Sequence, residues 1–273
     1  MNSYSSSPIE IIRSLSINKS LIYSLIKRDI KSRYQGSFLG ILWSFFNPIF
    51  MLAVYTFVFS VVFKAKWSGV DTGSKTTFAL ILFAGLIVFN FFAECVNSAP
   101  RVILNNANYV KKVIFPIETL PWVTIGSAFF HLCVSVVVWI LFYLIEIGLP
   151  HSTIFLLPVV LFPIILLVTG LTWFLSALGV YIRDIGQIVG IMTTVLMFLS
   201  PIFFPLDSLP EKYHAILNLN PLAPVISYMR DILYWGKLPN ITSYLIYTCI
   251  CLIVFVMGFI FFQKTRKGFA DVL

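Results

Sequence analysis

Long uncharged stretches alternate with short basic segments along this chain. The first such stretch, 38–63, has no charged residue and follows the basic segment 27–34 almost directly. A helix of 26 residues extends about 39 Å, which is enough to cross a membrane core of ~30 Å. The pattern therefore predicts a membrane-spanning helix at 38–63 rather than a buried helix of a water-soluble protein.

Five more apolar stretches follow the first. With it they predict an all-α polytopic membrane protein of six transmembrane helices, at about 38–63, 77–99, 117–147, 153–181, 187–204 and 243–262. The segment 205–242 is apolar but interrupted by prolines, which makes it too broken to cross. We expect it to dip into the outer membrane interface as short helices.

The residues before the first span have a different pattern. Apolar side chains recur at helical spacing, and Lys27, Lys31 and Tyr34 lie on another face; the apolar set is Leu21, Ile22, Leu25, Ile26 and Ile30. This pattern predicts an amphipathic helix in the cytoplasmic interface. We therefore divide the chain into a cytoplasmic N-terminal segment, 1–37, and a six-span domain, 38–273. The Ser-rich start predicts no cleaved signal peptide.

The composition is typical of a membrane protein, and it changes how the net positive charge of the chain is interpreted. Hydrophobic residues make up 59% of the chain, charged residues 11%, and the mean hydropathy is +0.94. A net charge of +8 would suggest nucleic-acid binding in a soluble protein. Here thirteen basic residues fall in predicted inner segments and six in outer ones, so the charge reads as a topology signal. We expect both termini inside, segments 64–76 and 205–242 outside, and no nucleic-acid partner.

The sequence offers little for catalysis. The predicted spans carry no charge near their midplanes, and no catalytic set or metal-ligand spacing is present. A weak enzyme signal comes from four residues predicted to lie outside, His151, Asp207, Glu211 and His214. The segment 69–76 only superficially resembles a phosphate-binding loop, because its glycine spacing is too short. We predict no catalytic or metal site, and the energy for any pumping must come from another polypeptide.

Aromatic side chains form a face on the first predicted span. The four residues are Trp43, Phe46, Phe50 and Phe57. Such a face can stack on sugar rings, which makes these residues the candidate substrate path. The alternative is contact with lipid, and for any single residue we favour that alternative.

Four groups of residues together resemble the membrane subunit of type-2 ABC exporters, in the branch that exports O-antigen, capsular and teichoic-acid-like polysaccharides. The groups are 27–34 with 40–48, 106–116, 181–185, and 200–205 with 220–224. The resemblance covers the chain from about Leu21 to its C-terminus. It implies a homodimer in the bacterial cytoplasmic membrane and a separate ATPase in two copies, which holds ATP and Mg²⁺. It also implies a lipid-linked glycan substrate and no cofactor in this chain.

The resemblance and the pattern together suggest site residues. Candidates for coupling to the ATPase lie in the inner loop, on the amphipathic helix and in the inner turn; they are Asn108, Tyr109, Lys111, Lys112, Arg28, Asp29, Arg183 and Asp184. The alternative for Lys111 and Lys112 is membrane anchoring through anionic headgroups. By resemblance, segment 205–242 forms re-entrant helices, and the candidate outer gate comprises Pro201, Pro205, Pro221 and Pro224.

Two other functions compete with polysaccharide export. One is a drug or lipid permease of the same superfamily, and the other is a membrane transferase acting on lipid-linked sugars. A transferase needs a polar cluster with an activated base at one face, and the sequence offers none. The aromatic content and the group 106–116 favour a glycan over a drug.

Overall fold

Helices are the only regular secondary structure in the part of the chain that the computed structural model describes, which is 8–58, 75–110, 115–204 and 219–273. The principal helices are α1 Pro8–Tyr34, α2 Trp43–Tyr55, α3 Lys75–Ser98, α4 Ala107–Val110, α5 Leu120–Glu146, α6 Leu157–Tyr181, α7 Ile185–Leu199, α9 Ala223–Arg230, α10 Ile241–Thr265 and α11 Phe269–Val272. The prediction of an all-α fold is confirmed.

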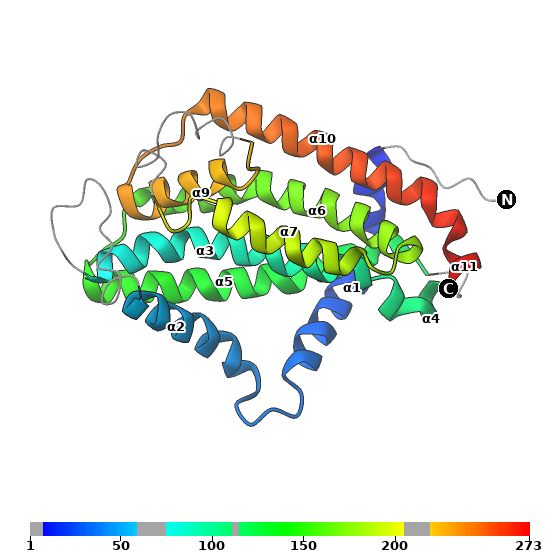
Figure 1. Ribbon diagram of the computed structural model, residues 1–273, viewed down its shortest axis with the longest axis horizontal. Helices are drawn as coiled ribbons and strands as arrows, with labels where there is room; N and C mark the ends of the chain where they lie inside the picture. The colour runs from blue at the N-terminus through cyan, green and yellow to red at the C-terminus, as the bar shows by residue number, and fades with distance from the viewer. Residues whose placement is uncertain (1–7, 59–74, 111–114, 205–218) are drawn as a thin grey trace.

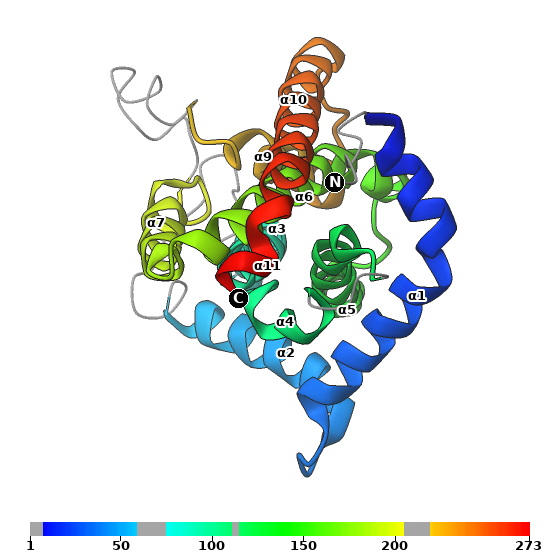
Figure 2. The ribbon, with the colours of Figure 1, turned by 90° about the vertical axis from the view of Figure 1, so that its right-hand side faces the viewer.

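The long helices lie side by side along one axis, with α1 running across them (Figure 1). Figure 2 looks along that axis and shows α1 wrapping one side of the bundle, close to α5. The predicted amphipathic helix is therefore present, and its apolar residues Ile22 and Leu25 are buried. Two glycines with positive φ, Gly36 and Gly40, shape the turn that leads from α1 to α2.

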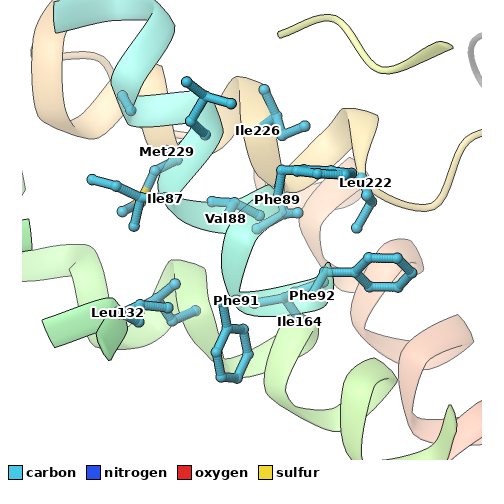
Figure 3. Close-up of a cluster of buried hydrophobic side chains, with 14 of the residues drawn as sticks. Ile87, Val88, Phe89, Phe91, Phe92, Leu132, Ile164, Leu222, Ile226 and Met229 are labelled. Carbon is cyan, nitrogen blue, oxygen red and sulfur yellow. The ribbon is translucent and has the colours of Figure 1, made fainter. Parts of the chain in front are cut away.

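α3 occupies the centre of the bundle. Its residues Ala79, Leu80, Ile81, Leu82 and Ala84 have no exposed surface. Figure 3 shows how its apolar side chains meet those of α5, α6 and α9; the labelled neighbours are Leu132, Ile164, Leu222, Ile226 and Met229. α3 is thus packed against protein on nearly every side.

Two glycines allow α6 and α10 to pack closely. A Cβ atom on Gly170 would lie 2.5 Å from the carbonyl oxygen of Val254, which is closer than real contacts allow. A Cβ atom on Gly258 would in turn overlap the backbone of Gly170. Small residues of this kind let the backbones of membrane helices approach each other.

Five helical segments in the described part of the chain are long and apolar enough to cross a membrane. They are Gly40–Val58, Thr76–Arg101, Ile117–Glu146, Ser152–Tyr181 and Ile241–Val272. They correspond to the predicted spans at 38–63, 77–99, 117–147, 153–181 and 243–262. The first begins at Gly40 rather than at 38, and residues 59–63 lie outside the described residues.

The fifth predicted span, 187–204, is shorter in the structure. Its helix, α7, has 15 residues and ends at Leu199. Ser200 is extended, with φ −84° and ψ 146°, because the proline that follows disfavours helical backbone at this position. Residues 201–204 form turns, so the structure shortens this predicted span at its end.

Between α7 and α10 the structure describes residues 200–204 and 219–240. In the second of these ranges the short helix α9 continues directly into one turn of π-helix, Asp231–Trp235, and α10 begins at the same end of the bundle (Figure 1). The prediction that this segment does not form a further span agrees with these residues.

Candidate coupling and gating sites

Two predicted coupling residues that are far apart in sequence meet at one end of the bundle. The sequence predicts that this end is cytoplasmic, so we call it the inner end and the opposite one the outer end. Arg28 of α1 donates a hydrogen bond of 2.9 Å from Nη1 to the hydroxyl of Tyr109 in α4. Its guanidinium carbon lies 6.0 Å from the centre of the Tyr109 ring, which stacks on Phe115 with centroids 4.4 Å apart. We call the described residues 99–110, which follow α3, the inner segment. It is connected to the amphipathic helix α1 through one tyrosine.

The other candidates near this contact differ in their surroundings. Asn108 is exposed, which leaves its amide open to a partner. Asp29 pairs with Arg33 one turn along α1 at 3.6 Å. Lys111 and Lys112 lie outside the described residues.

Arg183 and Asp184 are both exposed in the tight turn between α6 and α7. The amide of Ile185 donates to the carbonyl of Ile182 at 3.3 Å, which closes the turn that the sequence predicted. The 3-10 helix Ala99–Arg101 packs against this corner, because Gly179 of α6 has no side chain to hold off the Pro100 carbonyl. The inner segment thus touches α6 directly beside the turn.

The inner end also contains an ion pair that sequence reasoning missed. Arg266, just after α10, donates from Nη1 to the Glu118 carboxylate at 2.6 Å, and both side chains are largely buried. Ser14 of α1 donates to the same carboxylate at 3.3 Å, and Trp173 Nε1 donates to the Glu118 carbonyl at 3.3 Å. These contacts join α1, the start of the third span, α6 and the C-terminal end of α10.

A second missed cluster surrounds Glu94 of α3. Its carboxylate pairs with Arg33 at the end of α1 and lies 2.9 Å from His131 Nδ1 of α5. A carboxylate only accepts, so Nδ1 donates, and Nε2 of a neutral imidazole then accepts from the Tyr34 hydroxyl at 2.9 Å. Burial raises the pKa of Tyr34, which keeps its phenol a neutral donor.

His131 is packed and hydrogen-bonded between Tyr34 and Glu94 in this cluster. In the sequence, Glu94 is visible only as a glutamate near the end of an otherwise uncharged stretch. Its partners come from α1 and α5, at separations of 61 and 37 residues, which no local pattern reveals.

The four aromatic candidates for the substrate path all lie exposed along the first span. Trp43 and Phe46 meet edge to face with centroids 6.4 Å apart, and Phe46 stacks on Phe50 at 6.0 Å. Phe57 is exposed further along the same span. Other α2 side chains such as Phe45 are exposed too, so exposure alone does not distinguish a path from a lipid-facing surface. The substrate path stays a prediction.

At the opposite, outer end, Arg230 is a buried, hydrogen-bonded residue of the candidate gate region. It is 5% exposed. It donates three hydrogen bonds to carbonyl oxygens, at 3.1 Å to Ile81 of α3, 2.5 Å to Pro201 and 2.7 Å to Ile202. Gly85, one turn along α3, has no side chain to obstruct the guanidinium. Sequence reasoning had counted Arg230 only as an outer positive charge.

Further hydrogen bonds join the two proline-containing groups of the outer end. The side-chain amide of Asn220 donates to Ser200 Oγ at 2.8 Å, and the Tyr247 hydroxyl of α10 donates to the Pro221 carbonyl at 2.8 Å. Pro224 lies in the first turn of α9, and Pro205 lies outside the described residues. The structure therefore brings Pro201 and Pro221 into one bonded assembly, and their role as a gate stays a prediction.

Long apolar helices, a crossing amphipathic helix and a bonded inner segment define a polytopic helical membrane protein. The family described as ABC-2 type transporter matches residues 20–234, and the chain belongs to this family. The resemblance to type-2 ABC exporters seen in the sequence is therefore confirmed.

Curated relatives match the chain over nearly its full length. The O-antigen export system permease protein RfbA of Myxococcus xanthus is 27% identical over 270 residues, covering 96% of this chain and 99% of the relative. A protein of the same name from Klebsiella pneumoniae is 27% identical, with 93% and 95% covered. The polysialic acid transport protein KpsM of Escherichia coli is 24% identical, with 92% and 96% covered.

Proposed function

We propose that this chain is the permease subunit of an ATP-driven exporter that moves a lipid-linked cell-surface polysaccharide across the bacterial cytoplasmic membrane. The family and the names of the relatives support a permease for polysaccharides. The aromatic face of the first span supports a sugar substrate, since aromatic rings stack on sugar rings. ATP and Mg²⁺ belong to a separate ATPase in this proposal.

The observation that carries the proposal is the contact between Arg28 and Tyr109. An ATPase docked on the inner face needs a structured element attached directly to the spans. Through Arg28 the inner segment is bonded to α1, and through Pro100 it is packed against α6. A push at Asn108 and Tyr109 is thereby transmitted to two elements at once, one on each side of the segment.

The proposed assembly contains two copies of this chain and two copies of the ATPase. α2 and α7 both present exposed apolar side chains, among them Phe50, Ile191 and Phe198. A second copy would complete a path between such surfaces. The glycan then passes the α2 aromatics on its way outward.

The coupling role is tested by Asn108→Ala combined with Tyr109→Phe. The double variant keeps the stack on Phe115 and the net charge, but it removes an exposed amide and the hydroxyl that Arg28 binds. We expect normal membrane insertion and normal assembly with the ATPase, a severalfold loss of export and an altered ATP turnover. Both rates are measured in vesicles that contain the whole complex.

Tyr234→Phe provides the matched control, because it removes a tyrosine hydroxyl at the outer end, far from the ATPase. We expect it to leave export and ATP turnover unchanged. Normal values of both quantities in the Asn108→Ala, Tyr109→Phe variant would leave the segment only an anchoring role and would reject coupling at this position.

The proposed orientation has its own test. Single cysteines at the exposed positions Leu149 and Leu238, in a background without native cysteines, should react with an impermeant thiol reagent in intact cells. A cysteine at Lys267 should react only after the cells are opened. The reverse pattern would place the termini outside.

A further inference from the structure

A groove separates α1 from α5 where the amphipathic helix crosses the bundle. Its volume is about 750 Å³, within the range of small-molecule sites in proteins. The apolar side chains of its lining are Ile26, Ile30, Ile41, Phe129 and Phe130, with the exposed thiol of Cys133 beside them. The floor of the groove is therefore suited to a hydrocarbon chain.

Two cations line the same groove along α1. Lys27 and Lys31 are one helical turn apart, both are exposed, and the groove lining contains no carboxylate. Asp29 of α1 and Glu94 of α3 both pair with Arg33 rather than with either lysine. In the described parts of the chain neither lysine forms an ion pair, so both charges remain available to an anion.

Contacts on both sides hold the groove open. On one side, Ile26 packs so closely on Gly126 of α5 that a Cβ atom there would overlap it. On the other side, the Tyr34 hydroxyl is hydrogen-bonded to His131 of α5. α1 is therefore fixed to α5 at two points with the apolar floor between them, and the groove is preformed.

The arrangement requires an occupant that is apolar at one end and anionic at the other. Gly126–Cys133 lies within Ile117–Glu146, which is long and apolar enough to cross a membrane, so we place the floor of the groove in the hydrocarbon. A soluble ATPase does not reach that depth. A second copy of this chain packed here about a two-fold axis would bring its own Lys27 and Lys31 toward these two lysines, which like-charge repulsion opposes.

We propose that the groove holds an acyl chain of an anionic phospholipid from the leaflet that contains α1, with the phosphate bound by Lys27 and Lys31. A bound lipid would fill the space under α1 and hold the amphipathic helix at a fixed depth. This function is separate from export and from contact with the ATPase, because Lys27 and Lys31 line the membrane groove whereas Arg28 binds Tyr109.

The test uses the full-length chain in phosphatidylcholine vesicles that contain a small fraction of a photoreactive lipid. Two probes carry the same diazirine acyl chain, one as phosphatidylglycerol and the other as phosphatidylcholine. After illumination, mass spectrometry maps the attached lipid on the peptide that contains Phe129 and Phe130. We expect the phosphatidylglycerol probe to label this peptide roughly tenfold more than the phosphatidylcholine probe, given two basic groups at the headgroup.

Variants then separate the two parts of the site. Lys27→Gln combined with Lys31→Gln should lower phosphatidylglycerol labelling to the phosphatidylcholine level. Lys19→Gln combined with Lys267→Gln removes the same charge at exposed positions outside the groove and should change nothing. Cys133→Trp keeps both lysines but obstructs the floor, and it should lower labelling of the Phe129 peptide by both probes.

Three results would overturn the proposal. Equal labelling by the two probes would mean ordinary contact with bulk lipid. An unchanged ratio in the Lys27→Gln, Lys31→Gln variant would remove the lysines from the site. Displacement of the phosphatidylglycerol probe by an equimolar polyprenyl diphosphate-linked sugar would assign the groove to an exported lipid-linked glycan instead.

Discussion

α2 and α3 have the same kind of sequence and opposite surroundings. Both belong to segments that are apolar and long enough to span a membrane. Of the most apolar stretch of each segment, 83% is buried inside the molecule for α3 but only 11% for α2. α3 is enclosed by α5, α6 and α9, whereas α2 contacts mainly α5 and leaves most of its side chains outward.

The difference teaches that apolar character alone does not locate the core of a membrane protein. Lipid tails are as apolar as leucine, so a helix in lipid and a helix in protein have the same hydrophobic pattern. The central position of α3 is marked by hydrogen bonds that distant side chains donate to its backbone. Trp139 Nε1 donates to the Leu80 carbonyl at 2.9 Å, and Arg230 binds the Ile81 carbonyl.

We expect the largest effect on folding stability from removing Arg230, the cation beside α3. Arg230→Met leaves the buried carbonyls of Pro201 and Ile202 without their donor, at a cost of about 3 kcal/mol or more of folding stability. We expect little folded protein, measured as monodisperse material and thermal stability in detergent. Lys237→Met removes an exposed cation from the same region and should retain the stability of the parent. Equal stability of the two variants would contradict a structural role for Arg230.

A smaller loss is expected at the crossing of α6 and α10. Gly258→Ala forces a methyl group into the backbone of Gly170, and overpacking of this kind costs about 1–3 kcal/mol. The thermal midpoint in detergent should fall. Gly190→Ala on α7 is the matched change in open space, because no atom lies within 4 Å of its added Cβ. It should leave the midpoint unchanged or raise it slightly, since alanine favours helix; a large loss would indicate that α7 packs against something outside this chain.

The sequence predicted the features that depend on local pattern. The uncharged stretches located five long helices, and the spacing of Ile22 and Leu25 located the buried face of α1. The motif residues Arg28 and Tyr109 were both chosen as coupling candidates, although nothing local showed that they touch. The end of α7 was misplaced because four apolar residues after Ser200 hid the effect of Pro201 on the backbone.

The residues that sequence reasoning missed depend on long-range geometry. Glu118 and Arg266 are 148 positions apart, and Arg230 binds a carbonyl 149 positions away. A backbone carbonyl has no sequence signature, so a buried arginine that binds carbonyls looks like any loop cation. Burial of Arg230 becomes visible only when α9 is placed against α3.

The smallest effect on stability is expected on α2, where Phe46→Leu and Phe50→Leu change exposed side chains and should shift folding stability by less than about 0.5 kcal/mol. Under the substrate-path hypothesis, however, both changes remove an aromatic surface that stacks on sugar rings, and export should fall severalfold while ATPase assembly stays normal. Phe45→Leu is the matched control, because Phe45 is exposed on α2 but does not belong to the stack of Phe46 on Phe50. Export is measured as polysaccharide at the cell surface. If all three variants export normally, the aromatic side chains of α2 face lipid and do not line a substrate path. α2 and α3 would then differ only in that α2 contacts lipid and α3 contacts protein.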